Sequence, residues 1–438
     1  MTAHFIARSI RCTSLALLAA IPLAGNAAAG DGQPEGVLVI AGGGIRSGNA
    51  SLHRAFIDAM PEGAPGRVAI VAAASGSPVD TAARFRETLI AYGVAPGAIS
   101  VVELAVNDDP STPEVDESRW ANNAYDPAEI AKIEAADAIW LSGGDQSRLS
   151  AVLLADDGSA TPMLEAMRRR YAAGAVIGGT SAGAAVMSNP MITGGDSLAA
   201  LIDMDGAGEP LTIGAGLGFF AGGLVDQHFD ERARLGRLLV ALQRFESKRR
   251  LGFGVGEDTA LVYDGSNNAI TVVGTGHVTV VDARSARWHS SDSGTSIAEL
   301  RLSILSPGDT LDLDDGAFTP APYLKPTVGN EYHDREPIAG GGIAVAFSGL
   351  ANLLGEELLD NAGAQSLERL SFVLQQSTEE PAHRRAGAGV SFTFIQTPES
   401  QGYWGHGPDG AGRYSIRNVS LTVVPISLTI APASRHEE

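Results

Sequence analysis

The segment Val176-Ile-Gly-Gly-Thr-Ser-Ala-Gly-Ala-Ala-Val-Met187 decides the fold class, because it places Ser181 between an apolar, strand-like run and a small-residue, helix-compatible run. Gly179 and Gly183 allow a sharp turn and let the following helix pack closely beneath it. A serine in such a Gly-x-Ser-x-Gly turn is held up for nucleophilic attack, and the backbone N–H of Ala182 would point at a developing oxyanion. We therefore predict a nucleophile elbow with Ser181 as the nucleophile. The alternative is a structural strand-to-helix turn.

The residues on both sides of this segment alternate between short apolar strands and longer helical stretches. From Gly36 to about Asp282, strands are predicted at Val37–Ala41, Arg67–Ala72, Ala138–Leu141 and Ala175–Ile177, and helices at Leu52–Met60, Asp80–Tyr92 and Pro162–Ala173. This alternation predicts an α/β fold with a doubly wound, mostly parallel sheet. The loops at residues 42–46, 74–78, 143–146 and 180–183 would then meet at one edge, the edge at which such sheets bind ligands.

The composition and periodicity of the sequence change at about Arg287, where Pro and Gly become frequent and strand-like runs replace helical ones. Strands are predicted at residues 417–424 and 426–430, separated by Pro425, and helical periodicity persists near residues 343–359 and 364–375. We therefore predict a catalytic domain over residues 30–286 and a β-rich C-terminal domain over residues 287–438.

The first 29 residues have the pattern of a signal peptide. Arg8 and Arg11 precede an apolar run from Leu15 to Ala24, and Ala27–Ala29 offers a small-residue cleavage site. A membrane anchor is disfavoured because the run is short and contains Pro22. We expect a secreted protein, extracellular or periplasmic, with no membrane attachment after cleavage.

The composition restricts the chemistry and the partners. Cys12 is the only cysteine and precedes the predicted cleavage site, so the mature chain would have neither a disulfide nor a thiol nucleophile. The whole chain carries a formal charge of −20 from 31 basic and 51 acidic residues, and loss of the two N-terminal arginines makes it about −22. Such an acidic surface argues against a nucleic-acid partner. It favours either simple solubility or attraction of a cationic, arginine-rich substrate.

A serine nucleophile needs a base and a group that orients the base. His228 is the preferred base because the apolar run Leu224–Val225 delivers it to a predicted strand end. A buried, hydrogen-bonded histidine is the alternative interpretation, and His406 is a rival in the C-terminal region. The orienting acid is predicted in Glu257-Asp258, which interrupts an apolar, glycine-rich stretch just before a strand, although most acids in turns are simply solvated.

Two further sets of residues complete the predicted site. Gly144 would supply a second oxyanion N–H, since glycine lets the backbone approach a reacting carbonyl closely. Arg232, Arg234 and Arg237 are predicted on the first turns of a helix capped by Asp230, where positive charge opposes the helix dipole. This placement indicates carboxylate binding, with salt bridges to surface acids as the alternative, above all for Arg237.

Four motifs in this order resemble the cyanophycinases among the peptidase E-like serine peptidases, whose fold is similar to that of class I glutamine amidotransferases. They are Gly178-Gly-Thr-Ser-Ala-Gly-Ala-Ala-Val-Met187 with Met191-Ile-Thr-Gly-Gly195, Leu141-Ser-Gly-Gly-Asp-Gln146, Asp226-Gln-His-Phe229 with the arginines after it, and Glu257-Asp-Thr-Ala260. The resemblance covers roughly residues 36–285. Together with the predicted signal peptide and the long C-terminal region, it indicates an extracellular form.

The resemblance implies a substrate and a set of roles. Cyanophycin, multi-L-arginyl-poly-L-aspartate, is a poly-aspartate backbone bearing arginine on each β-carboxyl, and the family cuts this backbone to release β-Asp-Arg dipeptides. It implies Ser181 as nucleophile, His228 as base and Glu257 as orienting acid, and no metal or organic cofactor. The residues implied to line the substrate pocket are Gln146, Asp226, Gln227, Arg232, Arg234 and Arg237.

Other functions remain open on the sequence. A peptidase E-like hydrolase of short Asp-containing peptides would use the same triad. A non-catalytic secreted binding protein on this scaffold is disfavoured because Ser181, His228 and Glu257 are all present. A lipase-type α/β-hydrolase is disfavoured because its acid precedes the histidine in the chain. The C-terminal region would bind granules, support a homodimer or shield an edge strand.

Overall fold

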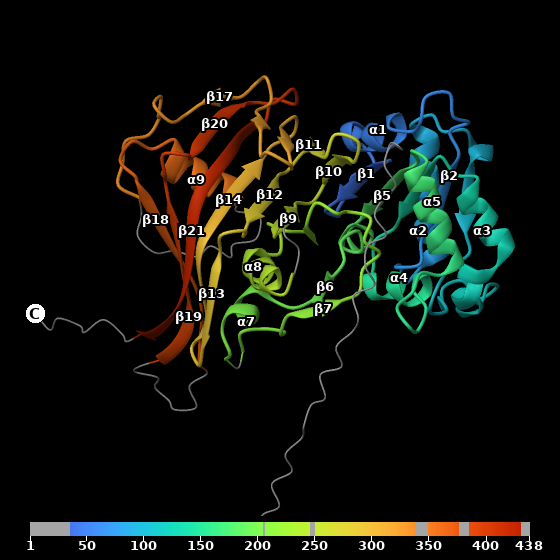
Figure 1. Cartoon of the computed structure of the whole chain (residues 1–438), viewed down its shortest axis with the longest axis horizontal. Helices are drawn as coiled ribbons and strands as arrows, with labels where there is room; N and C mark the ends of the chain where they lie inside the picture. Colours follow the sequence, from blue (N-terminus) through green and yellow to red (C-terminus); the bar gives the residue numbers. More distant parts are fainter. Residues whose placement is uncertain (1–35, 205, 246–249, 338–348, 376–384, 431–438) are drawn as a thin grey trace, which may run out of the picture. The chain divides into compact units, whose positions relative to one another are not determined.

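The structure is a computed structural model that describes residues 36–204, 206–245, 250–337, 349–375 and 385–430 (Figure 1). The predicted signal peptide, and the first part of the helical stretch predicted at 343–359, lie outside the described residues.

The first sheet contains the serine-bearing strand. Within the described residues it has the order β16-β15-β11-β10-β1-β5-β4-β2-β3. Strands β1, β5, β4, β2 and β3 pair in parallel, and β10, β11, β15 and β16 extend the sheet in antiparallel pairs. Its strands are β1 (Val37–Ala41), β2 (Val68–Val71), β3 (Ile99–Val102), β4 (Ala138–Leu141), β5 (Val176–Thr180), β10 (Thr259–Asp264), β11 (Ala269–Gly274), β15 (Thr310–Asp312) and β16 (Phe318–Thr319). The prediction of a mixed α/β fold with a parallel-containing sheet is confirmed.

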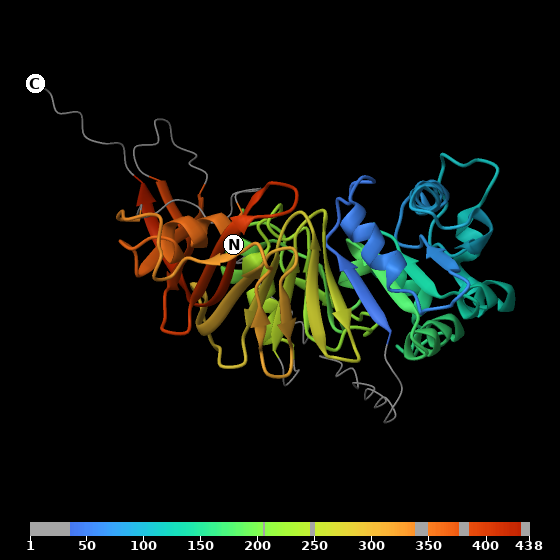
Figure 2. The ribbon, with the colours of Figure 1, turned by 90° about the horizontal axis from the view of Figure 1, so that it is seen from above.

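The second sheet begins inside the region predicted to be a single sheet and runs into the C-terminal region. Its path is β17-β20-β21-β14-β12-β9-β8, with β13 on β14 and the β18–β19 hairpin on β21. In Figure 2 the yellow strands lie between the blue-to-green part and the orange-to-red part of the chain. Its strands are β8 (Leu224–Gln227), β9 (Leu251–Val255), β12 (Val278–Asp282), β13 (Arg287–Ser291), β14 (Gly294–Leu305), β17 (Lys325–Pro326), β18 (Ser366–Leu374), β19 (Arg385–Ile395), β20 (Gln401–His406) and β21 (Gly412–Ile430).

This sheet is continuous across residue 286, because β12 pairs with β14 over five residue pairs. The β-rich character predicted for the C-terminal region is confirmed, and the division into two domains at residues 286 and 287 stays a prediction. A small antiparallel pair, β6 (Met191–Gly194) and β7 (Thr212–Gly214), stands apart from both sheets.

The helices are α1 (Ala50–Asp58), α2 (Pro78–Ala91), α3 (Pro127–Glu134), α4 (Gln146–Leu153), α5 (Pro162–Ala172), α6 (Ala182–Ala185), α7 (Ser197–Leu201), α8 (Leu235–Gln243) and α9 (Leu350–Leu354), with short helical segments η1 (Pro96–Ala98), η2 (Glu117–Tyr125) and η3 (Gly355–Leu359). Local chemistry explains where α5 begins and ends. Thr161 caps it by accepting a hydrogen bond from the Leu164 N–H, and Arg169 and Arg170 lie in its last turn, where positive charge interacts favourably with the helix dipole. None of the helices in the described residues has the length and apolar character needed to cross a bilayer.

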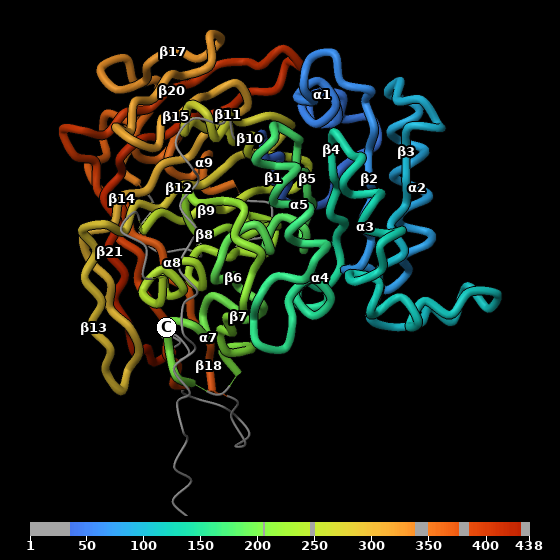
Figure 3. The backbone as a smooth tube through the Cα atoms, turned by 45° about the vertical axis from the view of Figure 1, so that its right-hand side comes forward, coloured from blue at the N-terminus to red at the C-terminus, as the bar shows by residue number. Residues whose placement is uncertain are grey.

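Three apolar clusters hold the sheets. Successive residues of β1 alternate between two of them, Leu38 and Ile40 in one and Val39 and Ala41 in the other, so both faces of the first sheet are covered. The third cluster joins α7, α8 and α9 to the second sheet. Figure 3 shows β6, β7, α7 and α8 gathered beside β8 and β9. The C-terminal strands therefore pack directly on the helices that follow the predicted catalytic residues.

Three local predictions are wrong. Residues 364–375 contain strand β18 and not a helix, because Ser366–Leu374 pair along their whole length with β19. Pro425 does not split β21. The pairing of β14 with β21 ends at Val423, so at Pro425 the strand is paired on one side only, with β19, and edge positions of this kind tolerate proline. Asp230 does not cap α8, which begins at Leu235 after a turn in which the Arg234 N–H donates to the Phe229 carbonyl.

Candidate active site

Ser181 lies between β5 and α6, where the chain turns sharply. Its backbone has φ 53° and ψ −110°, a conformation rare for a residue with a side chain, and its N–H donates to the Ala41 carbonyl of β1 at 2.9 Å. A Cβ on Gly179 would lie 2.3 Å from the Gly183 carbonyl oxygen, and one on Gly183 would lie 2.2 Å from the Leu141 carbonyl oxygen. Both glycines of the motif are therefore required for steric reasons, and the turn presents a serine on strained backbone.

His228 and Glu257 meet this serine. Ser181 Oγ lies 2.8 Å from His228 Nε2, and His228 Nδ1 lies 2.5 Å from Glu257 Oε1. Since a carboxylate only accepts, Nδ1–H donates to Glu257 and Nε2 is left to accept the serine proton. The three predicted residues thus form one hydrogen-bonded chain.

The three residues come from both sheets. Ser181 follows β5 of the first sheet, and His228 follows β8 of the second. Glu257 lies in the connection from β9 to β10, where the chain passes from the second sheet to the first. The serine and the histidine are therefore brought together by the packing of two sheets and do not share one sheet edge.

The glycines after β1 make room for this chain. A Cβ on Gly43, which has φ +109°, would lie 2.2 Å from His228 Cε1, and one on Gly44 would lie 2.7 Å from Glu257 Oε2. The His228 N–H donates to the Gly42 carbonyl at 2.8 Å, so the same loop also holds the histidine backbone. His228 itself has φ 45°. The imidazole is confined on the side of the β1 loop.

Burial lowers the pKa of His228, and the hydrogen bond that His228 donates to Glu257 opposes that effect, while the positive charges of Arg232 and Arg234 lower the pKa further. The imidazole is only 8% exposed. A neutral imidazole is the form that can accept a proton from Ser181. The surroundings of His228 therefore favour the protonation state that a base requires.

Two acids next to Glu257 have supporting positions. Glu231 Oε1 accepts the Glu257 backbone N–H at 3.1 Å. Asp258 is 4% exposed, and its carboxylate accepts the Arg46 N–H and an Asn49 amide N–H, at 3.0 and 2.9 Å. The structure thus separates the two acids of the predicted pair: Glu257 contacts the histidine, and Asp258 organises the loop after β1.

The two residues predicted to form an oxyanion hole lie near the serine: Gly144 lines the same cavity as Ser181, and Ala182 follows it in the chain. A Cβ on Gly143 would lie 3.3 Å from Ser181 Cβ, which places the 143–144 backbone against the serine. Ala182 is the first residue of α6, and the first N–H groups of a helix have no partner within it. The assignment of the Gly144 and Ala182 N–H groups to an oxyanion hole stays a prediction.

A cavity of about 690 Å³ opens beside Ser181. Of the residues predicted to line a substrate pocket, it contains Gln146, Gln227, Arg232, Arg234 and Arg237. Asp226 is not among its lining residues. The sequence analysis did not predict the acids and hydroxyls of this cavity, most of which lie in or beside the short elements α4, β6, α7 and β7: Asp145, Ser147, Thr193, Asp196, Ser197, Glu209 and Thr212.

Asp226 and Arg237 form a buried ion pair. Arg237 Nε and Nη2 donate to the two Asp226 oxygens at 2.8 and 2.5 Å, and Nη1 donates to the Gly195 carbonyl at 2.9 Å. The side chains are 1% and 5% exposed. Arg237 thus forms a structural salt bridge, which was the alternative interpretation of this residue. The ion pair joins α8 to β8, and the bond to Gly195 joins α8 to the segment that follows β6.

Arg232 and Arg234 are the more available cations. Arg232 is exposed, and no acid of the described residues lies within ion-pair distance of it. Arg234 Nη1 donates to the Gln227 carbonyl at 2.5 Å, and burial lowers the pKa of its guanidinium to about 10. Arg232 and Arg234 precede α8, with Arg234 as its N-cap residue, so of the three predicted arginines only Arg237 lies within the helix.

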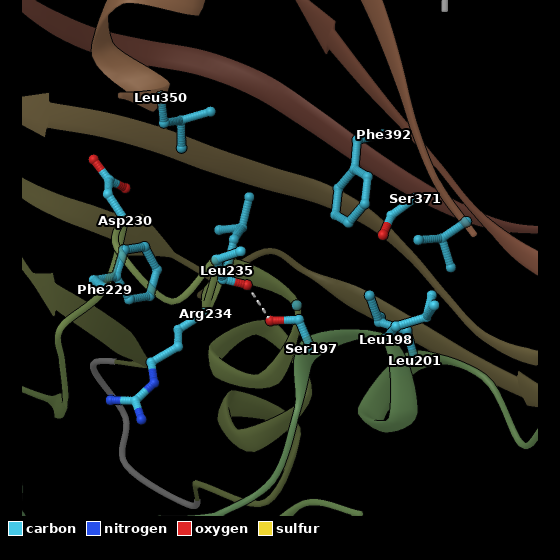
Figure 4. Close-up of a pocket in the computed structure, with 13 residues that line it drawn as sticks. Ser197, Leu198, Leu201, Phe229, Asp230, Arg234, Leu235, Leu350, Ser371 and Phe392 are labelled. Carbon is cyan, nitrogen blue, oxygen red and sulfur yellow. Dashed lines mark hydrogen bonds between the residues drawn. The ribbon is translucent and has the colours of Figure 1, made fainter. Parts of the chain in front are cut away.

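The segment that carries these arginines rests on the C-terminal region. Figure 4 shows a small cavity of about 30 Å³ where α7 and residues 229–236 meet Leu350, Ser371 and Phe392. Ser197 Oγ donates to the Ala233 carbonyl there at 2.6 Å, and the Arg234 guanidinium points away from Leu350 and Phe392. The C-terminal strands thus pack against residues 229–236, which carry Arg232 and Arg234, on the side opposite the active-site cavity.

Comparison with known proteins identifies the family of the chain. The sequence profile of peptidase family S51 matches residues 37–271, more than half of the chain. The chain belongs to peptidase family S51. This membership confirms the predicted resemblance and places the chain among serine-type peptidases.

Three curated relatives carry the name cyanophycinase. The protein of Geminocystis herdmanii is 41% identical over 187 residues, which are 40% of this chain and 62% of the relative. The protein of Synechococcus elongatus is 38% identical over 194 residues, which are 42% of this chain and 55% of the relative. The protein of Trichormus variabilis is 38% identical over 201 residues, which are 44% of this chain and 62% of the relative. The chain thus spans between 55% and 62% of the length of these relatives. A solved peptidase from an acI-B1 actinobacterium is 19% identical with a TM-score of 0.42, over 57% of this chain and 91% of that one.

His406, the rival candidate for the base, and possible metal ligands were also compared with the Ser181 site. His406 lies on β20 in the C-terminal region, in contact with Trp404, and does not belong to the Ser181 site. Across the described ranges, no cluster of three or more His, Cys, Asp or Glu side chains is arranged to hold a metal ion.

Proposed function

We propose that this S51 peptidase hydrolyses the poly-aspartate backbone of cyanophycin to β-Asp-Arg dipeptides, with Ser181, His228 and Glu257 as its catalytic triad. The observation that carries the proposal is the hydrogen-bonded chain from Ser181 Oγ through His228 to Glu257. This chain lies beside a cavity lined by both positively and negatively charged side chains. The proposal treats the parallel strands as a doubly wound sheet whose β5–α6 turn is the nucleophile elbow.

The first half of the reaction forms an acyl-enzyme. Ser181 Oγ attacks the scissile carbonyl carbon while its proton passes to His228 Nε2, and the oxyanion accepts hydrogen bonds from the N–H groups of Ala182 and Gly144. Glu257 stays ionised and stabilises the imidazolium that forms. Collapse of the intermediate breaks the C–N bond, and His228 returns the proton to the leaving amine.

The second half releases the product. A water molecule gives a proton to His228 and its oxygen attacks the ester carbonyl carbon of the acyl-enzyme. Breakage of the C–Oγ bond leaves a carboxylic acid, and the proton on His228 returns to Ser181 Oγ. The balance is one peptide bond and one water converted to one amine and one carboxyl group.

The charges of the cavity match the two ends of a β-Asp-Arg unit. Its arginyl carboxylate suits the Arg232 and Arg234 guanidinium groups, which can bind carboxylates in a bidentate manner. Its guanidinium suits the carboxylates of Asp145, Asp196 and Glu209 across the same cavity. Gln146 is held by hydrogen bonds from Nε2 to the Ile192 and Thr193 carbonyls, so its amide oxygen is oriented for a substrate N–H.

The alternatives differ in the substrate or in catalysis itself. A peptidase E-like enzyme would cut short Asp-containing peptides with the same triad and would not require a paired set of acids and arginines. A binding protein would not need the Ser181 hydroxyl within 2.8 Å of the imidazole. The geometry favours catalysis, and the mixed charge of the cavity favours the branched polymer.

The test is incubation of purified protein with insoluble cyanophycin, with turbidity and mass spectrometry of the soluble products as readouts. We expect clearing and release of β-Asp-Arg, lost in Ser181→Ala and retained in Ser118→Ala, which alters an exposed serine of η2. Cleavage of Asp-containing dipeptides without clearing would support the peptidase E-like alternative. A folded protein that is inactive on both substrates would support the binding-protein alternative.

Export is a separate part of the proposal. We propose that residues 1–29 are a signal peptide and that the enzyme acts outside the cytoplasm on polymer released by other cells. N-terminal sequencing of protein recovered from outside the producing cells tests this. We expect a start near Gly30, and retention of Met1 in protein that stays inside the cells would contradict it.

A further inference from the structure

A second large cavity lies in the C-terminal region, away from Ser181. Its volume is about 940 Å³, and it is formed where β17, β20, β21 and η3 come together with the loop after β17 (Figure 1). Its lining is rich in aromatic rings and also contains carboxylates: Tyr332, Trp404, Tyr414, His406, Glu356 and Asp360. Neither the triad nor the proposed mechanism uses these residues.

Three of the rings pack against one another, and a fourth, Tyr332, is exposed to solvent. The Trp404 ring lies 4.4 Å from the Tyr414 ring and 5.7 Å from the His406 ring, centroid to centroid. Tyr332 is 86% exposed, the highest value among the large apolar side chains of the described residues. An aromatic ring held in water at the mouth of an aromatic cavity is costly unless something covers it, so such a patch indicates a binding surface.

The carboxylates give this surface a preference for cations. Asp360 is 4% exposed, and its two oxygens accept hydrogen bonds from neutral donors, the Tyr332 N–H at 2.7 Å and the Tyr414 hydroxyl at 2.8 Å. No Lys or Arg side chain of the described residues lies within ion-pair distance of it. A buried carboxylate without a cationic partner lowers the free energy of a cation that enters beside it.

The other charges nearby do not neutralise the cavity. Glu356 is about half exposed and lies 4.0 Å from Arg335, at the limit of an exposed ion pair that contributes little. Lys325 is the one Lys or Arg among the described lining residues, and it is exposed. The inner part of the cavity is therefore aromatic and acidic.

We propose that this cavity binds arginyl guanidinium groups of the polymer at a distance from the catalytic centre, an inference that rests on the proposed function for the identity of the polymer. A guanidinium is planar, stacks on aromatic faces and donates to carboxylates, so it uses both features of the lining. A neutral sugar ring would also stack on the aromatic faces, but it would gain no charge–charge attraction from the carboxylates.

Such a site has a consequence for an insoluble substrate with many guanidinium groups. A second attachment raises the effective concentration of the chain at Ser181 without any change in the triad. Tyr323 also lines a neighbouring cavity of about 730 Å³ whose lining includes Asp258, the residue after Glu257. The aromatic site is therefore linked through neighbouring cavities to the loop that carries the catalytic acid.

Calorimetric titration of the Ser181→Ala protein with hexa-arginine tests the binding directly, with cellohexaose as the neutral probe. A salt concentration of about 0.15 M screens non-specific attraction to the acidic surface. We expect Tyr332→Ala and Glu356→Gln each to weaken hexa-arginine binding by about 2- to 5-fold. The matched control is Tyr125→Ala, which removes another exposed tyrosine, 53% exposed, from η2. Affinity in this control should be unchanged.

Equal hexa-arginine affinity in Tyr332→Ala, Glu356→Gln and Tyr125→Ala would overturn the proposal. Cellohexaose binding that is lost in Tyr332→Ala would also overturn it, in favour of a carbohydrate site. Hexa-arginine has no poly-aspartate backbone, so this titration does not depend on the proposed function. If the substitutions weaken hexa-arginine binding but cyanophycin is not hydrolysed, the guanidinium site stands and the proposed function fails. In the active enzyme, Tyr332→Ala should slow clearing of granules and leave kcat on a soluble two-unit fragment unchanged.

Discussion

Substitution of Gly43 by alanine tests whether the confined geometry of the triad is what makes Ser181 reactive. Gly43 lies in the loop after β1, has φ +109°, and approaches the imidazole so closely that an added Cβ would lie 2.2 Å from His228 Cε1 and 2.4 Å from Nε2. Carbon atoms in ordinary contact stay about 3.5 Å apart, so the imidazole or the loop must move by more than about 1 Å.

This displacement is large compared with the bond that it disturbs. Ser181 Oγ and His228 Nε2 are 2.8 Å apart, and a shift of about 1 Å brings them beyond hydrogen-bond distance unless the serine follows. Misplacement of a catalytic group by about 1 Å costs on the order of 100-fold in rate. The positive φ adds backbone strain of about 1–3 kcal/mol for a residue with a Cβ. We therefore expect Gly43→Ala to lower kcat at least about 100-fold and to lower the free energy of unfolding by about 1–3 kcal/mol.

The assay is kcat on cyanophycin together with urea unfolding of the same preparations. The matched control is Gly48→Ala in the same loop, because a Cβ there would meet nothing within 4 Å and its φ is not in the positive range. The control should keep the wild-type kcat. A folded Gly43→Ala protein with kcat within threefold of the wild type would refute the reasoning, since it would mean that the imidazole can move without loss of function.

Three further predictions concern charges. Activity should be lost as the pH falls through the pKa of His228, which burial holds below its ordinary value of 6.5, so the acid limb of kcat/KM should lie below pH 6.5; a limb above that value contradicts the environment described for the imidazole. Glu257→Gln should lower kcat by about 10³- to 10⁴-fold and shift that limb to lower pH, because the carboxylate raises the pKa of His228; an unchanged pH profile would mean that Glu257 does not act on the base. Asp226→Asn should lower the free energy of unfolding by about 3–5 kcal/mol because it leaves Arg237 buried without a counter-ion, whereas Asp282→Asn, in an exposed pair, should cost less than about 1 kcal/mol; equal effects in urea unfolding would contradict the assigned burial.

The predicted catalytic residues could be found from the sequence because their signals are local. Ser181 has glycines two residues away on each side, and the flanking runs differ in their periodicity. His228 follows an apolar run that predicts a strand, and Glu257 interrupts an apolar, glycine-rich stretch just before a predicted strand. The resemblance to a family then assigned their roles. The substrate cavity was less accessible to this reasoning: Asp196 and Glu209 stand in segments without periodicity, and only the β6–β7 pair brings them beside Ser181.

The errors share one physical cause. Residues 364–375 have helical periodicity, but pairing with β19 along nine residues satisfies their backbone and overrides the local preference. Pro425 is a local strand breaker that becomes harmless where β21 has lost its neighbour β14. In both cases a residue distant in the chain decides the local conformation.

The sequence by itself determined the strand–turn–helix at Ser181, the alternation of strands and helices around it, the acidic charge and the family. Each of these depends on short local patterns, on their order along the chain or on composition, and none requires knowledge of which segments pack together. Tertiary structure alone decided that β8 and β9 leave the first sheet, so that His228 reaches Ser181 across two sheets. It also decided that Asp226 is paired with Arg237, whereas Arg232 has no acid of the described residues within ion-pair distance. Burial and pairing depend on which segments pack together. The aromatic cavity around Trp404 belongs to the same class, because its walls come from strands more than seventy residues apart that only the second sheet brings into register.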